Sequence, residues 1–436
     1  MIMWKRWLLG AILLSFAHAT HAVLKIEITK GIAGALPLAI VPFETNGAAL
    51  SIAQRVDNII EANLERSGYF SPIPRSDFLA WPTEASQVRC KDWSILGAEN
   101  IVIGSIRPVG NAYEVRYVLY DVLRCTQIQG QRFRVHDNQL RKLAHQISDQ
   151  IYLALTGTQG AFSTSIAYVT AMRDTRGNHR YMLHVADSDG YAPKTIMTSK
   201  HSLISPAWSP DGSKIAYATF EHGPVTVYVQ DLATGKRQRL VHTKDQVSAP
   251  AWSPDGRKLA VVISRKGRRD IYIVDLATRG LKQLTHTSAA NFNTEPVWAP
   301  DGKSIVYTSH SGGRPQLYRV NVDGGRAKRI TFEGKYNTRG TFSPDGKLLA
   351  MVHGDRSGYH IAVLELETGT FRVLTETGLD ESPTFAPNGS MILYATRSRK
   401  RGVLAAVSTD GRVSQRYELL EGWDAREPAW GPFLKP

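Results

Sequence analysis

Residues Trp208–Gly212 read WSPDG, a pattern of an aromatic residue, serine or alanine, proline, aspartate and glycine. Its other copies, one with asparagine in place of aspartate and the last one truncated, are Trp252–Gly256, Trp298–Gly302, Phe342–Gly346, Phe385–Gly389 and Trp430–Pro432. Successive prolines of the six copies are 44, 46, 44, 43 and 45 residues apart. A self-similarity with this period is typical of β-propellers and other repeat arrays.

Each copy predicts a tight turn between two antiparallel strands. Proline fixes φ near −65° at the second turn position, aspartate tolerates the third, and glycine ends the turn. After the first copy, three further strand-like runs follow at Lys214–Thr219, Val225–Leu232 and Arg237–Val241. Four short strands in a unit of about 44 residues predict one propeller blade, with the aromatic residues of the turns packed between blades.

The first and last parts of the array complete each other. Ser165–Thr170, Tyr181–Ala186 and Lys194–Thr198 are three strands without a first strand, whereas Arg426–Trp430 is a first strand without successors. We therefore predict a six-bladed propeller in which the C-terminal strand becomes the innermost strand of the blade that begins at Ser165. This arrangement removes exposed sheet edges.

The residues before the array follow a different pattern. Leu38–Phe43 is an apolar strand-like run, and Asn100–Ile106 and Tyr113–Val122 resemble paired strands. Ser51–Ser67 and Asn138–Leu155 carry apolar residues at helical spacing. The sequence thus predicts a multidomain chain, with an N-terminal α/β domain at 23–160 and an all-β propeller of four-stranded blades at 161–436.

The first 22 residues are interpreted as a secretory signal peptide. Lys5 and Arg6 precede an apolar run, Trp7–Ala17, which is shorter than the about 20 residues that a membrane-spanning helix needs. Cleavage is expected after Ala22, and no later segment is apolar enough to span a bilayer. The mature chain is therefore predicted to be exported and to contain no transmembrane segment.

The formal net charge of +14 favours acidic partners: nucleic acid, an anionic lipid surface or an acidic protein. The plainer interpretation is a solvated basic surface with no dedicated partner. The densest basic cluster, Arg397–Arg401, falls in a predicted blade loop and has no interleaved aromatic residues to stack on bases. Binding to nucleic acid is therefore not expected.

Cys90 and Cys125 are the only cysteines of the chain, and both fall in the N-terminal region. Export permits a disulfide between them, because disulfides persist in oxidising compartments. Two buried free thiols are the alternative, and the sequence leaves both open.

No motif for catalysis is present. The chain lacks GxSxG, HExxH, a P-loop and cysteine-based metal spacing, so we expect no enzyme activity, no cofactor and no metal site. The loops that lead into the innermost strands open on one mouth of the channel and carry Asp245, Glu295, Arg339, Asp380, Glu381, Asp424, Arg426 and Glu427. These charged groups indicate a binding site, although a solvated rim that binds nothing is the alternative. Calcium among the channel carboxylates is left open.

The whole chain resembles the TolB family of the Tol-Pal system. The segments that carry the resemblance include LAIVPF at 38–43, LTGTQGAFSTSIAYV at 155–169, SPAWSPDGSKIAYATFE at 205–221, NTEPVWAPD at 293–301 and LDESPTFAPNG at 379–389. The order of signal peptide, N-terminal domain and six-blade array is also similar to the family. The cysteine pair and the strongly basic charge are not features that the family leads one to expect.

The resemblance implies a non-enzymatic periplasmic adaptor. It would connect the inner-membrane Tol proteins to the peptidoglycan-associated lipoprotein Pal and support outer-membrane integrity and constriction during cell division. Pal, and also bacteriocins, would dock at one propeller mouth, and other outer-membrane proteins are further candidate partners. The predicted Pal face comprises Gln246, Thr294, Glu295, Arg339, Asp380, Glu381, Arg426 and Glu427.

The mature N-terminus resembles the segment that contacts TolA, and its residues are Val23, Leu24, Lys25, Ile26, Glu27 and Ile28. We expect this segment either to dock as an added edge strand or to fold back on the protein. The competing hypothesis for the chain as a whole is an enzyme or small-ligand binder that uses the channel.

Overall fold

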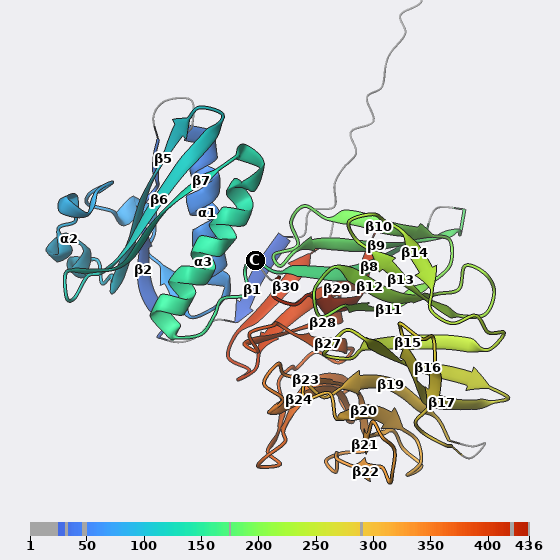
Figure 1. Ribbon diagram of the computed structural model, residues 1–436. Helices are drawn as coiled ribbons and strands as arrows, with labels where there is room; N and C mark the ends of the chain where they lie inside the picture. The colour runs from blue at the N-terminus through green and yellow to red at the C-terminus, as the bar shows by residue number, and fades with distance from the viewer. Residues whose placement is uncertain are drawn as a thin grey trace, which may run out of the picture.

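The computed structural model describes residues 25–30, 34–45, 50–173, 176–287, 291–418 and 423–434. They form an N-terminal α/β unit and a six-bladed β-propeller beside it (Figure 1). The predicted fold class is confirmed. The predicted signal peptide, Val23 and Leu24 lie outside the described residues.

The N-terminal unit is built on one mixed sheet with the strand order β4-β2-β5-β6-β7, and β3 pairs with β5. Its strands are β2 Leu36–Ile40, β3 Glu44–Thr45, β4 Phe70–Pro72, β5 Asn100–Val109, β6 Ala112–Asp121 and β7 Thr126–Val135. Its α-helices are α1 Leu50–Arg66, α2 Cys90–Ile95 and α3 Leu140–Thr156, and its 3₁₀ helices are η2 Arg75–Asp77, η3 Ala85–Gln87 and η4 Asp137–Gln139.

Both faces of this sheet are covered. On one face, Leu64 of α1 and Ile147 of α3 join one buried apolar cluster with Val102 of β5. On the other face, Trp93 of α2 packs edge-on against Phe78 at a centroid distance of 5.0 Å. Because both faces are covered, β5 is buried without interruption from Asn100 to Ile106.

Each propeller blade is an antiparallel sheet, and we number the blades from 1 to 6 along the chain. Blade 1 contains β8 Ser165–Arg173, β9 His179–Asp187, β10 Lys194–Ser199 and the C-terminal β31 Asp424–Trp430. Blade 2 contains β11 Leu203–Trp208, β12 Lys214–Thr219, β13 Thr226–Asp231 and β14 Arg237–Arg239. Blade 3 contains β15 Gln246–Trp252, β16 Lys258–Arg265, β17 Arg268–Asp275 and β18 Leu281–Gln283. Blade 4 contains β19 Asn293–Trp298, β20 Ser304–Ser309, β21 Gln316–Asn321 and β22 Lys328–Arg329. Blade 5 contains β23 Tyr336–Phe342, β24 Leu348–Gly354, β25 Tyr359–Glu365 and β26 Phe371–Val373. Blade 6 contains β27 Glu381–Phe385, β28 Met391–Ser398, β29 Arg401–Ser408 and β30 Ser414–Glu418.

The ring closes as the sequence predicts. β31 is the innermost strand of blade 1 and pairs antiparallel with β8, with Trp430 opposite Ile166. Three tryptophans of the repeat, Trp208, Trp252 and Trp298, connect neighbouring blades, because each donates its indole N–H to the inner strand of the blade before it. Trp208 donates to the Ala429 carbonyl at 3.0 Å, and Trp252 donates to the Ala207 carbonyl at 3.1 Å.

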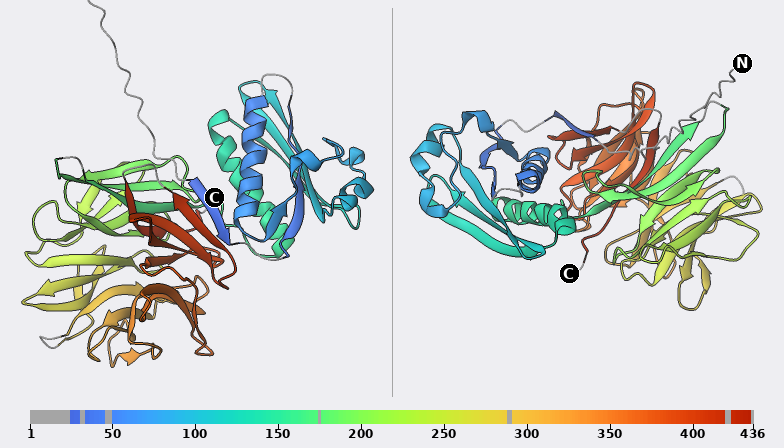
Figure 2. Two further views of the ribbon diagram at one scale, coloured as in Figure 1. Left: turned by 180° about the vertical axis from the view of Figure 1, so that it is seen from behind. Right: turned by 90° about the horizontal axis from the view of Figure 1, so that it is seen from above.

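Blade 6 departs from the four-strand prediction. β1, at Lys25–Lys30, adds a fifth strand to this blade by pairing antiparallel with β30, with Ile28 opposite Gln415. The segment thus folds back on its own chain as an edge strand, the second of the two expectations from the sequence, and docking on TolA stays a prediction. Figure 2 shows β1 beside the red strands of blade 6, at the junction with the N-terminal unit.

The N-terminal unit contacts the side of the propeller that carries the proline–aspartate–glycine turns. Asn388, in the turn of blade 6, donates to the Gln159 carbonyl at 2.9 Å. Arg66 donates to Ser188, after β9, at 2.9 Å. We call this side the turn face. The opposite side, which holds the loops leading into the innermost strands, is the mouth face and points away from the N-terminal unit.

Candidate functional site: the propeller channel and its mouth

Strand register brings the predicted rim residues together on the mouth face. Gln246, at the start of β15, lies opposite Ser264, next to the β16–β17 hairpin. Glu381, at the start of β27, lies opposite Ala395 in the same way. The mouth face therefore consists of two sets of loops, those that lead into innermost strands and the hairpins that join the second and third strands of each blade.

All six innermost strands have a break in register at the same position. At each break one residue other than glycine has φ between 47° and 56°, in the left-handed region, and these residues are Ser205, Ala249, Glu295, Arg339, Ser382 and Glu427. The left-handed conformation costs such a residue about 1–2 kcal/mol, so contacts with the surrounding ring must stabilise this backbone conformation. The six residues line the channel, which makes them a six-fold set of bulges around its axis.

Four of these bulge residues form one network of ion pairs and hydrogen bonds inside the channel. The Arg339 guanidinium lies 3.1 Å from Glu295 and 3.3 Å from Glu427, and it donates to Ser382 at 2.5 Å. The Glu427 carboxylate raises the pKa of Arg339 further above its ordinary value, so the group stays charged. We call this network of Glu295, Arg339, Ser382 and Glu427 the waist.

The carboxylates of the waist are fixed by further bonds. Glu427, 8% exposed, accepts the Ser205 backbone N–H at 2.9 Å. Glu295 accepts the Thr308 hydroxyl at 2.8 Å. One cation thus neutralises part of two carboxylates in a partly buried setting, where ion pairs need such supporting hydrogen bonds. The waist is therefore part of the internal structure of the ring.

Two cavities adjoin the waist, and Glu295 and Arg339 line both. The cavity on the turn face has a volume of about 690 Å³ and is lined largely by prolines and by Trp208, Trp252, Trp298 and Trp430. The cavity on the mouth face has a volume of about 650 Å³ and is lined mostly by polar and charged groups, including Tyr336, Tyr359, Glu381, Arg397, Lys400, Asp424 and Arg426. The mouth cavity is the one that can meet a polar partner from outside.

The structure divides the predicted Pal-face residues into three groups. Gln246 and Glu381 are exposed on the rim, and Arg426 is half-buried beside Asp424 at 3.7 Å. Thr294 is half-buried on β19, one residue from the mouth end of the strand. Glu295, Arg339 and Glu427 belong to the waist instead of the outer rim. Tyr336 and Tyr359 were not singled out by the sequence analysis, although their positions beside a strand of the repeat could have indicated them.

Asp380 forms the third group by itself. It is 1% exposed and accepts hydroxyl protons from Thr375 at 2.5 Å and Thr377 at 2.7 Å. Burial raises the pKa of its carboxyl, and these hydrogen bonds work in the opposite direction. Its carboxylate therefore supports the loop from inside, although the residue also lines the mouth cavity.

A second cluster of ionisable groups lies where the N-terminal unit meets blade 1. His145 of α3, Asp187 and Asp189 have ligand atoms within 4.8 Å of one another, the spacing of a metal site. The Arg141 guanidinium already binds both carboxylates, at 2.7 Å from Asp187 and 2.5 Å from Asp189. Burial alone would raise the pKa of Asp189, but Arg66, His145 and Arg141 outweigh it and lower the pKa to about 2. The cluster acts as an ion-pair contact between the two units.

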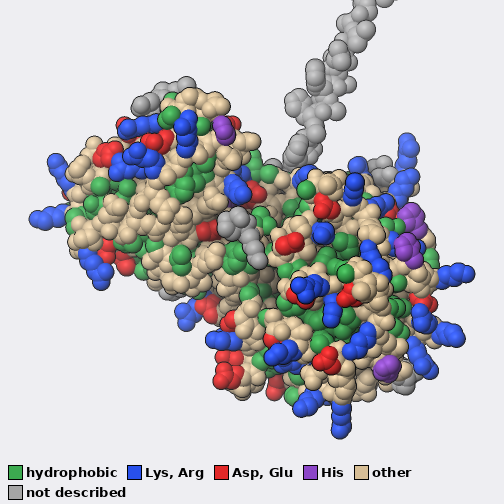
Figure 3. Space-filling model, in the orientation of Figure 1, with side chains coloured by type: hydrophobic (Ala, Val, Ile, Leu, Met, Phe, Trp, Pro, Cys, Tyr) green, Lys and Arg blue, Asp and Glu red, His purple; other side chains and the backbone are tan. Residues whose placement is uncertain are grey.

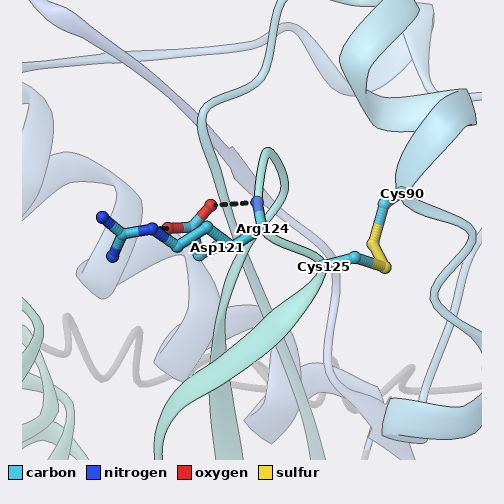
Figure 4. Close-up of a disulfide and its surroundings, with 4 residues drawn as sticks. All are labelled: Cys90, Asp121, Arg124 and Cys125. Atoms are coloured by element: carbon cyan, nitrogen blue, oxygen red, sulfur yellow. Dashed lines mark hydrogen bonds and ion pairs between the residues drawn. A yellow bond between two sulfur atoms is a disulfide. The ribbon is translucent and has the colours of Figure 1, made fainter.

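The structure contains the disulfide between Cys90 and Cys125, the first of the two arrangements that the sequence leaves open. Their Cα atoms are 5.7 Å apart, and the bond ties the start of α2 to the turn between β6 and β7 (Figure 4). Asp121 supports the turn by accepting the Arg124 backbone N–H at 2.8 Å. The bond lies at the end of the N-terminal unit that is remote from the propeller (Figure 1).

Across the part of the chain that the structure describes, no helix has both the length and the apolar character needed to cross a membrane.

Comparison with known proteins gives consistent matches over nearly the whole chain. The family model for the TolB amino-terminal domain matches residues 24–128, and the model for the TolB beta propeller domain matches residues 152–434. The Tol-Pal system protein TolB of Nitrosococcus oceani is 53% identical over 415 residues, covering 95% of this chain and 94% of that protein. Its counterpart in Xanthomonas campestris pv. campestris is 49% identical, with 98% of each chain covered.

A solved structure agrees with these sequence matches. The crystal structure of TolB from Acinetobacter baumannii has a TM-score of 0.87 to this chain at 40% identity. The match covers 94% of this chain and 100% of the Acinetobacter chain, so the likeness extends over both units.

Proposed function

The chain belongs to the TolB family of the Tol-Pal system, and from this premise we propose that it is a non-enzymatic periplasmic adaptor. In this proposal it binds the lipoprotein Pal at the mouth face and TolA through its mature N-terminus, which begins at Val23. It thereby supports outer-membrane integrity and constriction during cell division. Bacteriocins would use the same mouth face, and other outer-membrane proteins are further candidate partners.

The observation that carries the Pal proposal is the polar cavity of about 650 Å³ on the side of the propeller away from the N-terminal unit. Its floor is the waist, which is fixed by hydrogen bonds and ion pairs, and its rim carries exposed polar residues. A preformed hollow with a polar rim suits the docking of a folded partner, since little ordering is needed on binding. Catalysis is not part of the proposal, because the sequence carries no GxSxG, HExxH or P-loop motif.

Binding of Pal from the same organism, measured by calorimetry, tests this placement. Thr294→Arg and Gln246→Arg add bulk and charge on the mouth face and are expected to weaken binding at least about tenfold, the size of effect typical of an interface contact of over 1 kcal/mol. Asn321→Arg, at the end of β21 on the turn face, is the matched control and should leave binding unchanged. Wild-type binding that survives both mouth changes would overturn the placement.

Glu295→Arg is unsuitable for this test, although Glu295 is one of the predicted Pal-face residues. Its carboxylate binds Arg339 at 3.1 Å, so the substitution would break the waist as well as any contact with Pal. Glu381→Lys is the cleaner charge reversal, because Glu381 is exposed on the rim.

The TolA proposal rests on the position of β1. As the edge strand of blade 6, β1 uses one row of its backbone groups to pair with β30. Addition of a strand to a sheet edge is a common mode of peptide recognition, and β1 cannot pair with β30 and offer the same groups to TolA. We therefore expect a free peptide of residues 23–32 to bind TolA more tightly than the full chain does, because the full chain must first release β1. Equal affinities would contradict this role for docked β1.

A further inference from the structure

The hairpins of the mouth face carry clusters of exposed basic residues. The β16–β17 hairpin of blade 3 carries Arg265, Lys266, Arg268 and Arg269, and the β28–β29 hairpin of blade 6 carries Arg397, Arg399, Lys400 and Arg401, all with exposed side chains. Blades 3 and 6 are three positions apart in a ring of six, so these hairpins face each other across the channel. Hairpins of the other blades add Arg173, Arg180, Arg314 and Arg356, which are also exposed. Figure 3 shows many Lys and Arg side chains projecting on the side of the propeller away from the N-terminal unit.

The turn face has a different composition. Each of its proline–aspartate–glycine turns places an aspartate within a few residues of a lysine or arginine, as in Asp211 and Lys214, or Asp255 and Arg257. Asp301 with Lys303 and Asp345 with Lys347 repeat this pattern in blades 4 and 5. Alternating charges of this kind largely cancel at a distance, whereas a cluster of one sign produces a field that reaches into the solvent.

Many of the acidic groups near the mouth are already engaged. Asp245 binds Arg265 at 2.8 Å, and Glu295 and Glu427 hold Arg339 in the waist. Asp270 is 3% exposed and accepts the Thr285 hydroxyl at 2.9 Å. The exposed carboxylates of Glu333, Asp355, Glu376 and Glu381 offset only part of the basic charge. The mouth face is therefore left with an excess of exposed positive charge, which we call the basic rim.

We propose that the basic rim steers Pal to the mouth through an acidic surface on Pal that complements it. The inference rests on the proposed function and adds the chemistry of the partner surface. Like-signed charges around a docking site raise the rate of encounter with an oppositely charged partner, often by one to two orders of magnitude at low salt. The effect is screened over a distance of about 8–10 Å at ordinary ionic strength, so it acts on the approach more than on the finished contact.

A protein surface fits this rim better than an anionic lipid surface does. The rim surrounds a hollow and contains exposed glutamates between its basic hairpins. A flat anionic membrane would meet these glutamates as well as the cations, whereas a folded partner can present both signs of charge where they are needed. The charge pattern also accounts for a net basic character that the family resemblance leaves unexplained.

The test measures association of the full chain with Pal by stopped flow from low to physiological salt. The rim variant combines Lys266→Gln, Arg268→Gln, Arg356→Gln and Arg399→Gln, none of which lines the mouth cavity. The control variant combines Arg257→Gln, Lys258→Gln, Lys303→Gln and Lys347→Gln on the turn face and removes the same charge. We expect the association rate of the rim variant at low salt to fall about tenfold or more, with a shallower salt dependence and a dissociation rate within about threefold of wild type. The control should associate like the wild type.

The outcomes separate this inference from the proposed function. If the wild type does not bind Pal at any salt concentration, the proposed function itself fails. If the wild type binds but the rim and control variants associate equally fast, or only dissociation changes, Pal binding stands and the steering role is overturned. A further measurement tests lipid binding, by sedimentation of the wild type and the rim variant with vesicles of phosphatidylglycerol and phosphatidylethanolamine. Rim-dependent vesicle binding without any effect on Pal association would assign the rim to a lipid surface and also overturn the inference.

Discussion

The guanidinium of Arg339 lies 3.3 Å from the carboxylate of Glu427, so β23 of blade 5 is joined to β31 of blade 1 across the channel. These blades are not neighbours, because blade 6 lies between them, and the Arg339 guanidinium also reaches Ser382 of that blade. Two kinds of contact therefore close the ring. β31 pairs with β8 within blade 1, and the waist joins blades 4, 5, 6 and 1 across the channel.

Arg339→Met is expected to destabilise the propeller. The substitution keeps the volume of the side chain but leaves Glu295 and the 8%-exposed Glu427 without their cation. Removing one partner of a fully buried pair costs about 3–5 kcal/mol, and because Arg339 is about one third exposed we expect about 1–3 kcal/mol. Urea unfolding of the full chain measures the loss, and adding Glu295→Gln and Glu427→Gln should restore most of it.

Arg319→Met is the matched control for the waist. Arg319 lies 4.0 Å from Asp301 at the surface, where an ion pair contributes about 0–1 kcal/mol, and it also donates to the Ser304 hydroxyl at 2.7 Å. If Arg339→Met has an effect as small as Arg319→Met, the waist does not stabilise the ring.

The stability of the propeller is predicted to fall below pH 6.5 because of His184. The side chain is 4% exposed between the hydroxyls of Thr170 at 2.8 Å and Thr195 at 3.1 Å, and burial lowers its pKa to about 4. The unfolded chain, with a histidine pKa near 6.5, takes up the proton first as the pH falls. The contribution of neutral His184 is therefore full above pH 6.5 and is lost progressively between pH 6.5 and pH 4.

The size of this effect at pH 5 is about 2 kcal/mol relative to pH 7, from a pKa difference of about two and a half units. Thermal or urea unfolding across this pH range should show the drop in the wild type and a smaller drop in His184→Gln. His242→Gln, a change at an exposed histidine, should keep the wild-type profile. Identical profiles for the wild type and His184→Gln would contradict the assignment.

The period of the repeat was enough to predict the blades, because the turn chemistry of Pro210, Asp211 and Gly212 is local. Gly212 has φ of 69°, as that turn requires, and the Ser209 hydroxyl donates to Asp211 at 2.5 Å. Ring closure could also be predicted, because the first blade lacks its innermost strand and the last strand of the chain lacks the other strands of a blade. Pairing the two completes a six-bladed ring. Local spacing therefore decided most of the fold.

The site was harder to predict, because it depends on how far each side chain reaches from its strand. Sequence analysis grouped Asp380, Glu381 and Glu427 together as rim charges, but only Glu381 is exposed. The left-handed bulges that turn Glu295 and Glu427 inward leave no signature in a sequence without glycine at these positions. The sequence allowed the N-terminal segment to fold back but did not indicate β30 as its partner, because the pairing joins residues nearly 400 positions apart, such as Ile28 and Gln415.

Removing the disulfide is expected to destabilise the N-terminal unit. Cys90→Ser with Cys125→Ser opens a loop with a sequence separation of 35 residues. The chain-entropy estimate for a loop of this length gives about 4 kcal/mol, and measured effects are usually about 2–4 kcal/mol. Urea unfolding followed by the fluorescence of Trp93, which lies in α2 close to the bond, should show a lower midpoint.

A reductant should reproduce the effect in the wild type and change nothing in the double serine variant, which is the control for other consequences of the treatment. Equal unfolding midpoints for the oxidised wild type and the double variant would show that η3 and α2 are held by packing around Trp93 alone.

The last prediction concerns the strength with which β1 is held to blade 6. Ile28→Pro removes a backbone donor in the middle of β1, where Ile28 lies opposite Gln415. The edge pairing is expected to open, and those amides of Gln415–Tyr417 that face β1 should exchange with deuterium at least about tenfold faster, since exchange reports local opening. The amides of β29, which is covered by β28 and β30, should keep their protection.

Thr29→Ala is the matched control, because it removes only the hydroxyl that donates to the Ser414 carbonyl at 3.2 Å and leaves the backbone pairing intact. Unchanged exchange in Ile28→Pro would mean that β1 does not protect the edge of blade 6, and the segment would then be available to a partner without first being released.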